Sequence, residues 1–148
     1  MVQELVALLK TVELFDELTD AQLQRLTEIG ETLTFNKDDV IFAQGAEGHR
    51  LYVIRNGEVE VRIGEDPQRA RPEVYLGRGQ IFGEMALIDG GPRSATAVCS
   101  RDGTQLYCIT REAFHDLCKS DTALGYVVMR NMAHELSFKL RHHNLTLI

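Results

Sequence analysis

The sequence lacks the features that would direct a chain to a membrane or out of the cell. Its N-terminus has no basic stretch leading into an apolar run of secretory length. No uninterrupted apolar segment approaches the roughly 18 residues of a membrane-spanning helix. We therefore expect a cytoplasmic protein that does not bind a membrane.

Positive charge is also in short supply. The chain has 16 lysine and arginine residues against 22 aspartate and glutamate residues, a formal net charge of -6. Nucleic acids and anionic membranes attract clustered lysine and arginine, so this balance argues against a nucleic-acid partner. An anionic ligand would have to be held by a local group of residues.

Cysteine is scarce as well. The three cysteines, Cys99, Cys108 and Cys118, are odd in number and lack the spacing of metal ligands. They lie in apolar runs such as residues 106–109, which predicts buried, reduced thiols. We expect no metal site built on them.

What is present is an ordinary globular composition. A length of 148 residues with 44% hydrophobic and 26% charged residues indicates one domain, residues 1–148, with a core of its own. Residues 1–30 have helical apolar spacing, and Asp20 is the predicted N-cap of a second helix. Helical spacing returns over residues 111–143, where it predicts one long amphipathic helix from about Asp121 onward to His143.

Between these helical parts, residues 31–110 follow the two-residue period of strands. Turn signals separate short apolar segments at intervals of about 8–12 residues, which favours a sandwich, barrel or jelly roll over alternating βαβ units. The predicted strands are 33–35, 40–42, 51–54, 59–63, 74–76, 95–98 and 106–109. The glycines at 45, 57, 79 and 103 are assigned to turns, and the polar segment 64–72 to a surface loop.

The stretch 79–96 interrupts the strand pattern. It holds a single turn's worth of helix formers, residues 84–88, entered through Gly83 and stopped by two glycines and a proline at 90–92. A glycine lets a ligand approach the main chain closely, and the N–H groups at the start of a helix favour an anion. This stretch therefore predicts a binding element.

Three side chains in this stretch point to a nucleotide. Arg93 offers a planar fork of donors suited to phosphate, and Ser94 adds a hydroxyl and an N–H. A phosphate would repel the carboxylate of Glu84, but that carboxylate can accept the O–H of a neighbouring ribose. Phosphate and ribose hydroxyl together describe a nucleotide.

Residues 82–87 (FGEMAL) followed by 92–96 (PRSAT) closely resemble the phosphate-binding cassette of cyclic nucleotide-binding domains. Residues 41–45, 51–54 and 56–59 resemble that family's strand and turn pattern, so the resemblance covers nearly the whole chain. It implies an α+β, mainly β fold: a double-stranded β-helix (jelly-roll) β-roll with N-terminal helices, a short cassette helix and C-terminal helices.

The resemblance also implies a site. Glu84 would accept the ribose 2′-hydroxyl and Arg93 would pair with the cyclic phosphate. The full set of implied ligand-binding residues is Phe82, Gly83, Glu84, Met85, Ala86, Arg93, Ser94 and Ala95. In the family a threonine directly after the cassette arginine favours cyclic GMP, and Ser94 stands there, so the expected ligand is cyclic AMP.

The long C-terminal helix is expected to act as a lid. Asn131, Glu135 and Lys139 lie four residues apart and form one row, from which one side chain could reach the base. By resemblance, this helix packs over the base or pairs with its twin in a homodimer. The expected activity is that of a regulatory sensor with a protein effector, with no catalytic residue, no metal and no further cofactor.

Other interpretations stay open. Arg93 and Glu84 could form a structural ion pair, and the chain could be a cyclic GMP sensor or an interaction module that has lost its ligand. A metal enzyme of the cupin type is disfavoured, because only His49 of the five histidines lies in the strand region. A transcription factor of the family would continue into a helix-turn-helix domain, so a stand-alone sensor or truncated module is expected.

Overall fold

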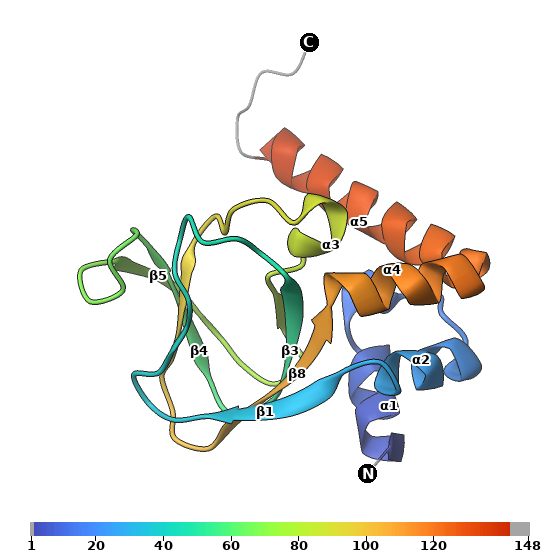
Figure 1. Ribbon diagram of the computed structural model, residues 1–148, viewed down its shortest axis with the longest axis horizontal. Helices are drawn as coiled ribbons and strands as arrows, with labels where there is room; N and C mark the ends of the chain where they lie inside the picture. Colours follow the sequence, from blue (N-terminus) through green and yellow to red (C-terminus); the bar gives the residue numbers. More distant parts are fainter. Residues whose placement is uncertain (1, 143–148) are drawn as a thin grey trace.

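The computed structural model describes residues 2–142 and consists of two sheets with helices gathered at one end (Figure 1). The strands are β1 (Glu31–Phe35), β2 (Val40–Phe42), β3 (Arg50–Asn56), β4 (Val59–Ile63), β5 (Arg71–Leu76), β6 (Ile81–Phe82), β7 (Thr96–Cys99) and β8 (Thr104–Thr110). The helices are α1 (Val2–Lys10), η1 (Glu13–Phe15), α2 (Asp20–Thr27), α3 (Ala86–Asp89), α4 (Arg111–Ser120) and α5 (Thr122–His142).

Both sheets are four-stranded and antiparallel. The first has the order β1-β8-β3-β6 and the second β2-β7-β4-β5, so apart from β4 and β5 no neighbours in a sheet are consecutive in sequence. The connections therefore cross between the sheets, as in a roll. The predicted α+β, mainly β fold is confirmed.

The two-residue period has a physical cause in the first sheet. Successive side chains of a strand point to opposite faces. The face toward the helices carries Leu51, Val53, Tyr107 and Ile109. The face toward the second sheet carries Tyr52, Ile54, Leu106 and Cys108. This sheet is thus buried on both faces, and the cavity of the roll lies on the side away from the helices.

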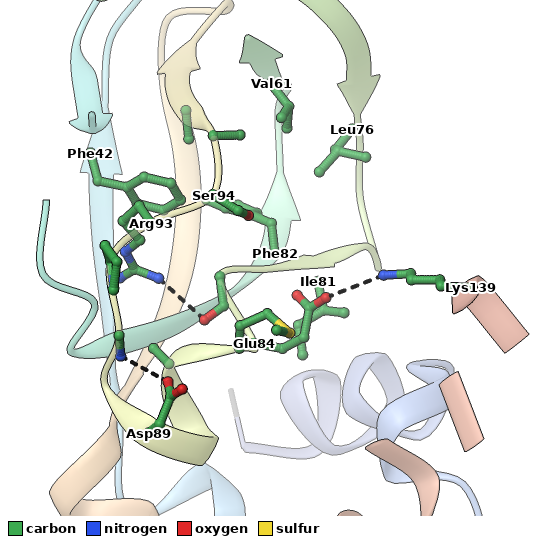
Figure 2. Close-up of a pocket in the computed structure, with 17 residues that line it drawn as sticks. Phe42, Val61, Leu76, Ile81, Phe82, Glu84, Asp89, Arg93, Ser94 and Lys139 are labelled. Atoms are coloured by element: carbon green, nitrogen blue, oxygen red, sulfur yellow. Dashed lines mark hydrogen bonds and ion pairs between the residues drawn. The ribbon is translucent and has the colours of Figure 1, made fainter. Parts of the chain in front are cut away.

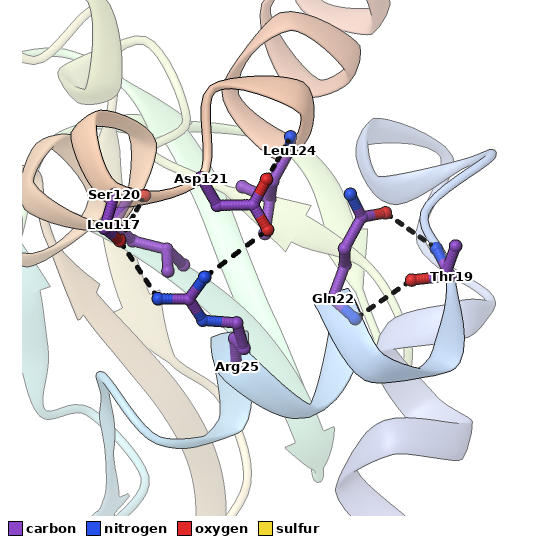
Figure 3. Close-up of polar contacts among 7 residues, drawn as sticks. All are labelled: Thr19, Gln22, Arg25, Leu117, Ser120, Asp121 and Leu124. Carbon is purple, nitrogen blue, oxygen red and sulfur yellow. Dashed lines mark hydrogen bonds and ion pairs between the residues drawn. The ribbon is translucent and has the colours of Figure 1, made fainter.

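The predicted N-cap of the second helix is wrong by one residue. Thr19 caps α2, because its hydroxyl accepts from the Gln22 N–H while the Gln22 side chain accepts from the Thr19 N–H (Figure 3). Asp20 is the first residue of the helix. An aspartate is also favourable in the first turn of a helix, so the sequence pattern fits an N-cap at Thr19 as well as at Asp20.

The C-terminal helical part is divided at Asp121. The Asp121 carboxylate accepts from the Leu124 N–H at 3.0 Å, which makes it the cap of α5 (Figure 3). Arg25 of α2 reaches the same junction and bonds Ser120 at 3.0 Å and Asp121 at 3.5 Å. The predicted long helix is confirmed over Thr122–His142, while His143 lies outside the described residues.

Two other boundaries differ from the sequence prediction. The loop predicted at 64–72 is shorter, because β5 begins at Arg71 and Ala70 is already buried. β6 was not predicted, because two residues are too few to show a period. Its pairing with β3 is what places the next residue, Gly83, against the first sheet.

Helix α5 is held mainly by its first half. Its buried residues are Leu124, Gly125, Val128 and Met132. A Cβ at Gly125 would lie 2.9 Å from the Cβ of Cys118, so the glycine permits close contact between α4 and α5. No helix among the described residues is both long and apolar enough to cross a membrane.

The cysteine prediction is correct for two of three residues. Cys99 and Cys108 are free and buried, whereas Cys118 is free but only half-buried. Burial raises the pKa of the Cys108 thiol to about 12, so this thiol stays protonated and unreactive at neutral pH.

Candidate functional site

A pocket of about 370 Å³ opens between β6, the α3 segment and the inner side of the second sheet (Figure 2). Its volume lies within the range of small-molecule sites. All of the predicted ligand-binding residues line it: Phe82, Gly83, Glu84, Met85, Ala86, Arg93, Ser94 and Ala95. The two halves of the sequence motif, separated by α3, are therefore brought to one cavity.

The backbone around Gly83 sets the shape of the polar wall. Gly83 has φ +74°, in the left-handed region, and a Cβ there would lie 2.7 Å from Nη1 of Arg93. The helix predicted at 84–88 begins later, at Ala86, so Glu84 lies in the preceding turn. Gly90, also left-handed at φ 65°, ends α3 as predicted.

Arg93 is held in place by contacts on several sides. Its side chain is buried, with the guanidinium 4.1 Å from the centre of the Phe42 ring. Nη1 donates to the Gly83 carbonyl at 3.2 Å (Figure 2), and Nη2 donates to the Arg50 carbonyl at 2.9 Å. Burial lowers the pKa of Arg93, but an arginine remains charged in proteins. The site therefore contains an oriented, buried cation.

Glu84 does not pair with Arg93. Its carboxylate lies 3.8 Å from Nζ of Lys139 (Figure 2), and Lys139 in turn bonds Glu135 at 3.0 Å. This excludes the structural Arg93–Glu84 ion pair considered from the sequence. Burial raises the pKa of Glu84, the nearby Glu135 raises it further, and Lys139 and Arg93 oppose the shift.

Lys139 is the only residue of the predicted lid row that lines this pocket within the described residues. Desolvation would lower the pKa of Lys139, but its hydrogen bond and ion pair with Glu135 and its attraction to Glu84 raise it overall. Glu135 lies behind Lys139 and orients it. Asn131 instead donates to the carbonyls of Leu14 and Asp16, at 3.0 and 2.8 Å, and anchors α5 to the η1 segment.

The opposite wall of the pocket is apolar and was not identified from the sequence. It consists of Phe42, Val61, Leu76, Ile81 and Ala97, several of which lie along the strands in Figure 2. These residues alternate with outward-facing ones, so their period was visible in the sequence. The period alone does not tell a residue that lines a cavity from one that fills a core.

The arrangement suits a ligand with three kinds of surface. A buried guanidinium and the Ser94 hydroxyl face an anionic group, Glu84 faces a hydroxyl donor, and the strands offer an apolar wall. Within residues 2–142, no three His, Cys, Asp or Glu side chains are grouped so as to hold a metal ion.

Comparisons with known proteins agree with this geometry. Residues 32–121 match the family model described as "Cyclic nucleotide-binding domain". The chain is 35% identical to a cGMP-dependent protein kinase of Drosophila melanogaster (isozyme 2) over 74% of this chain and 12% of the kinase. It is 36% identical to the cyclic AMP receptor protein of Thermus thermophilus over 72% of this chain and 47% of that protein.

A solved structure is similar to the whole arrangement. The catabolite activator protein of Thermus thermophilus superposes with a TM-score of 0.77 and 31% identity, over 90% of this chain and 60% of that one. The chain thus spans about half of one relative's length and about a tenth of the other's.

Proposed function

Because the chain belongs to the cyclic nucleotide-binding domain family, we propose that its pocket binds cyclic AMP and that its role is regulatory, without catalysis. One observation carries the proposal. A buried arginine and a half-buried carboxylate, the two charged residues of the family's cassette, line one cavity whose other wall is apolar. This combination matches the phosphate, ribose and base of a cyclic nucleotide.

Arg93 holds the cyclic phosphate in this proposal. Two of its N–H bonds are used by the carbonyls of Gly83 and Arg50, and these fix the guanidinium plane. The second hydrogen of each Nη atom is left for phosphate oxygens, together with the Ser94 hydroxyl. A charge held in position before the ligand arrives avoids the entropic cost of ordering it during binding.

Glu84 recognises the ribose in this proposal. Its carboxylate accepts the 2′-hydroxyl, and Lys139 on the same carboxylate connects the sugar position to α5. In this proposal α5 is the lid, with Lys139 as its contact with the site and Glu135 as the residue that orients Lys139. Asn131 serves as the anchor of the helix and does not touch the base.

The choice of cyclic AMP over cyclic GMP rests on Ser94. The relatives include a cyclic AMP receptor and cyclic GMP-dependent kinases, so relatedness alone does not choose between the bases. The threonine that favours cyclic GMP in the family is replaced here by Ser94, which lines the pocket. A cyclic GMP sensor, or an interaction module without ligand, is the alternative.

A longer assembly is the setting in which such a module would act. Helix α5 exposes Tyr126, Met129, Phe138 and Leu140. We propose that this apolar surface contacts an effector domain or a second copy of the chain. The ligand would then alter that contact by its different affinity for the two positions of α5.

Calorimetric titration of the chain with cyclic AMP, cyclic GMP and cyclic di-GMP tests the proposal. We expect one cyclic AMP per chain, bound more tightly than cyclic GMP, and no binding of cyclic di-GMP. Tighter binding of cyclic GMP than of cyclic AMP would mean that the chain is a cyclic GMP sensor. Absence of any binding would leave the interaction module as the function.

A further inference from the structure

A second pocket lies on the outer side of Arg93. It has a volume of about 520 Å³ and is separate from the cavity between the sheets. It is lined by Ile41, Phe42, Glu47, His49, Arg50, Tyr52, Arg93, Thr110, Arg111 and Glu112. These residues come from β2, the loop before β3, β3 itself and the start of α4, so the pocket is built from several elements.

Three arginines line this outer pocket, and their charges are not neutralised by neighbours. Among residues 2–142, Arg50, Arg93 and Arg111 take part in no ion pair within 4.0 Å, whereas many other arginines do. Arginines that gather without carboxylate partners repel one another. Such a cluster is stabilised when an anion enters it.

Unsatisfied donors belong to the same pocket. In the described part of the chain, two buried side-chain polar atoms have no hydrogen-bond partner, Nε of Arg93 and Nε of Arg111. Both arginines line the outer pocket. A buried N–H without an acceptor costs about 1–3 kcal/mol, so an acceptor bound at this pocket would be favoured by both arginines.

The surroundings of Arg111 position it at this pocket. Its stem packs on Gly90, where a Cβ would lie 3.5 Å from Cδ, and its backbone N–H donates to the His49 carbonyl at 2.8 Å. Tyr52 is buried beside them. Burial raises the pKa of Tyr52, so its phenol keeps its proton and remains a hydrogen-bond donor.

The acidic residues of the pocket lie at its rim. Glu47 has a side chain 83% exposed and contacts His49 at 3.5 Å, and Glu112 is exposed as well. Solvent screens such charges more than it screens the buried guanidinium of Arg93, and Arg50 and Arg111 are themselves half-buried. The interior of the pocket is therefore positive, with the apolar side chains of Ile41 and Phe42 beside it.

We propose that the outer pocket binds a phosphoryl group, with Arg50 and Arg111 as its main ligands and Arg93 as the wall shared with the nucleotide pocket. Phosphate oxygens accept from several guanidinium donors at once, which satisfies both unpaired Nε groups. The pocket exceeds the size of the free ion, so an organic substituent has room against Ile41 and Phe42.

Titration of the full chain, without nucleotide and at constant ionic strength, tests this site. Inorganic phosphate and phenyl phosphate are added, with sodium chloride as the salt control, and backbone amide shifts are followed by NMR. We expect saturable shifts at residues 47–50 and 110–112. Tighter binding of phenyl phosphate identifies a monoester as the ligand, and binding of inorganic phosphate alone identifies the free ion; either supports the site.

Variants separate this pocket from the cassette. Arg111→Met keeps the stem that packs on Gly90 and should weaken binding at least about tenfold, as should Arg50→Gln, since a charged hydrogen bond contributes about 1.5–3 kcal/mol. Arg101→Met, at an exposed arginine remote from the pocket, should leave phosphate binding unchanged. The proposal would be overturned if both pocket variants fold and keep the phosphate affinity of the wild type, or if the amide shifts on adding phosphate are confined to residues 83–95. Neither result would contradict cyclic nucleotide binding.

Discussion

The carboxylate of Glu84 and the ammonium of Lys139 lie 3.8 Å apart, which joins the α3 turn to the last turns of α5. The Lys139 side chain is half exposed, whereas that of Glu84 is 13% exposed. The contact thus connects a buried group of the pocket with a helix that is largely in solvent. Any ligand that hydrogen-bonds to Glu84 alters the neighbourhood of Lys139 directly.

The first prediction concerns Lys139→Met. Ion pairs with an exposed partner contribute at most about 1 kcal/mol, so cyclic AMP affinity should change by less than about fivefold. Amide hydrogen exchange over the last turns of α5 should become faster in the free variant. Arg141→Met, exposed on the same helix end and without an ion pair among the described residues, is the control. Exchange equal to that of the wild type would mean that other contacts hold the helix.

The second prediction concerns Arg93→Met. Loss of a buried charge partner should weaken cyclic AMP binding by about 2–5 kcal/mol, measured by calorimetry. The variant should also melt at a lower temperature, because the carbonyls of Gly83 and Arg50 lose their donor. Arg101→Met is the matched surface control. A folded Arg93 variant with full affinity would remove Arg93 from the phosphate site.

The third prediction concerns the ribose. Glu84→Gln keeps an acceptor but loses the charge-assisted part of the hydrogen bond, about half of its strength. The wild type should prefer cyclic AMP to 2′-deoxy cyclic AMP, and the variant should lose most of that preference. Competition titrations with the two nucleotides measure it. Equal affinity of the wild type for both would show that Glu84 does not contact the 2′-hydroxyl.

The fourth prediction concerns the pH dependence of cyclic AMP affinity, which also depends on Glu84. Burial raises the pKa of Glu84 above its ordinary value of 4.5, so the carboxylate becomes protonated at a higher pH than an exposed one. Cyclic AMP affinity should therefore fall on acidification through this raised pKa, and the fall should be absent in Glu84→Gln. Affinity that does not vary with pH in the wild type would contradict the assignment.

The stability of the free protein should vary in the opposite sense. Between the unfolded and the raised folded pKa of Glu84, the folded state binds more protons than the unfolded state. The contribution of this group to the free energy of unfolding therefore decreases as pH rises through that interval. Glu84→Gln should remove this slope in thermal melts that are recorded without ligand.

The fifth prediction uses two glycines with nearly the same backbone. Gly83 and Gly103 have φ +74° and +73°, so alanine strains both equally. A Cβ at Gly83 meets Nη1 of Arg93 at 2.7 Å, whereas a Cβ at Gly103 meets nothing within 4 Å. Gly103→Ala should lower stability by about 1 kcal/mol and leave binding unchanged. Gly83→Ala should also weaken nucleotide binding, and equal affinities in both variants would refute the role of this close approach.

Local sequence signals predicted much of this structure because they act over a few residues. The strands of the roll except β6, the glycine that ends α3 and the cassette at 82–96 were identified. The start of α3 was placed too early, because Glu84 and Met85 form a turn in which the Leu87 and Ile88 N–H groups donate to carbonyls three residues back. Helix propensity does not reveal this geometry.

The parts that could not be predicted all depend on which face of an element meets another. Asn131, Glu135 and Lys139 share one helical row, yet Asn131 bonds the η1 segment while Lys139 enters the pocket. The outer pocket likewise brings Arg50 and Arg111 together from separate elements. Neither result follows from spacing along the chain.

The attachment of α5 through its first half makes its second half a mechanical lever. The last anchors are Asn131 and Met132, and Lys139 lies eight residues beyond Asn131, about 12 Å along the axis at 1.5 Å per residue. A bend of about 20° at these anchors would move Lys139 by about 4 Å, a displacement comparable with its 3.8 Å separation from Glu84. A modest bend of the helix is therefore sufficient to make or break the contact with the pocket.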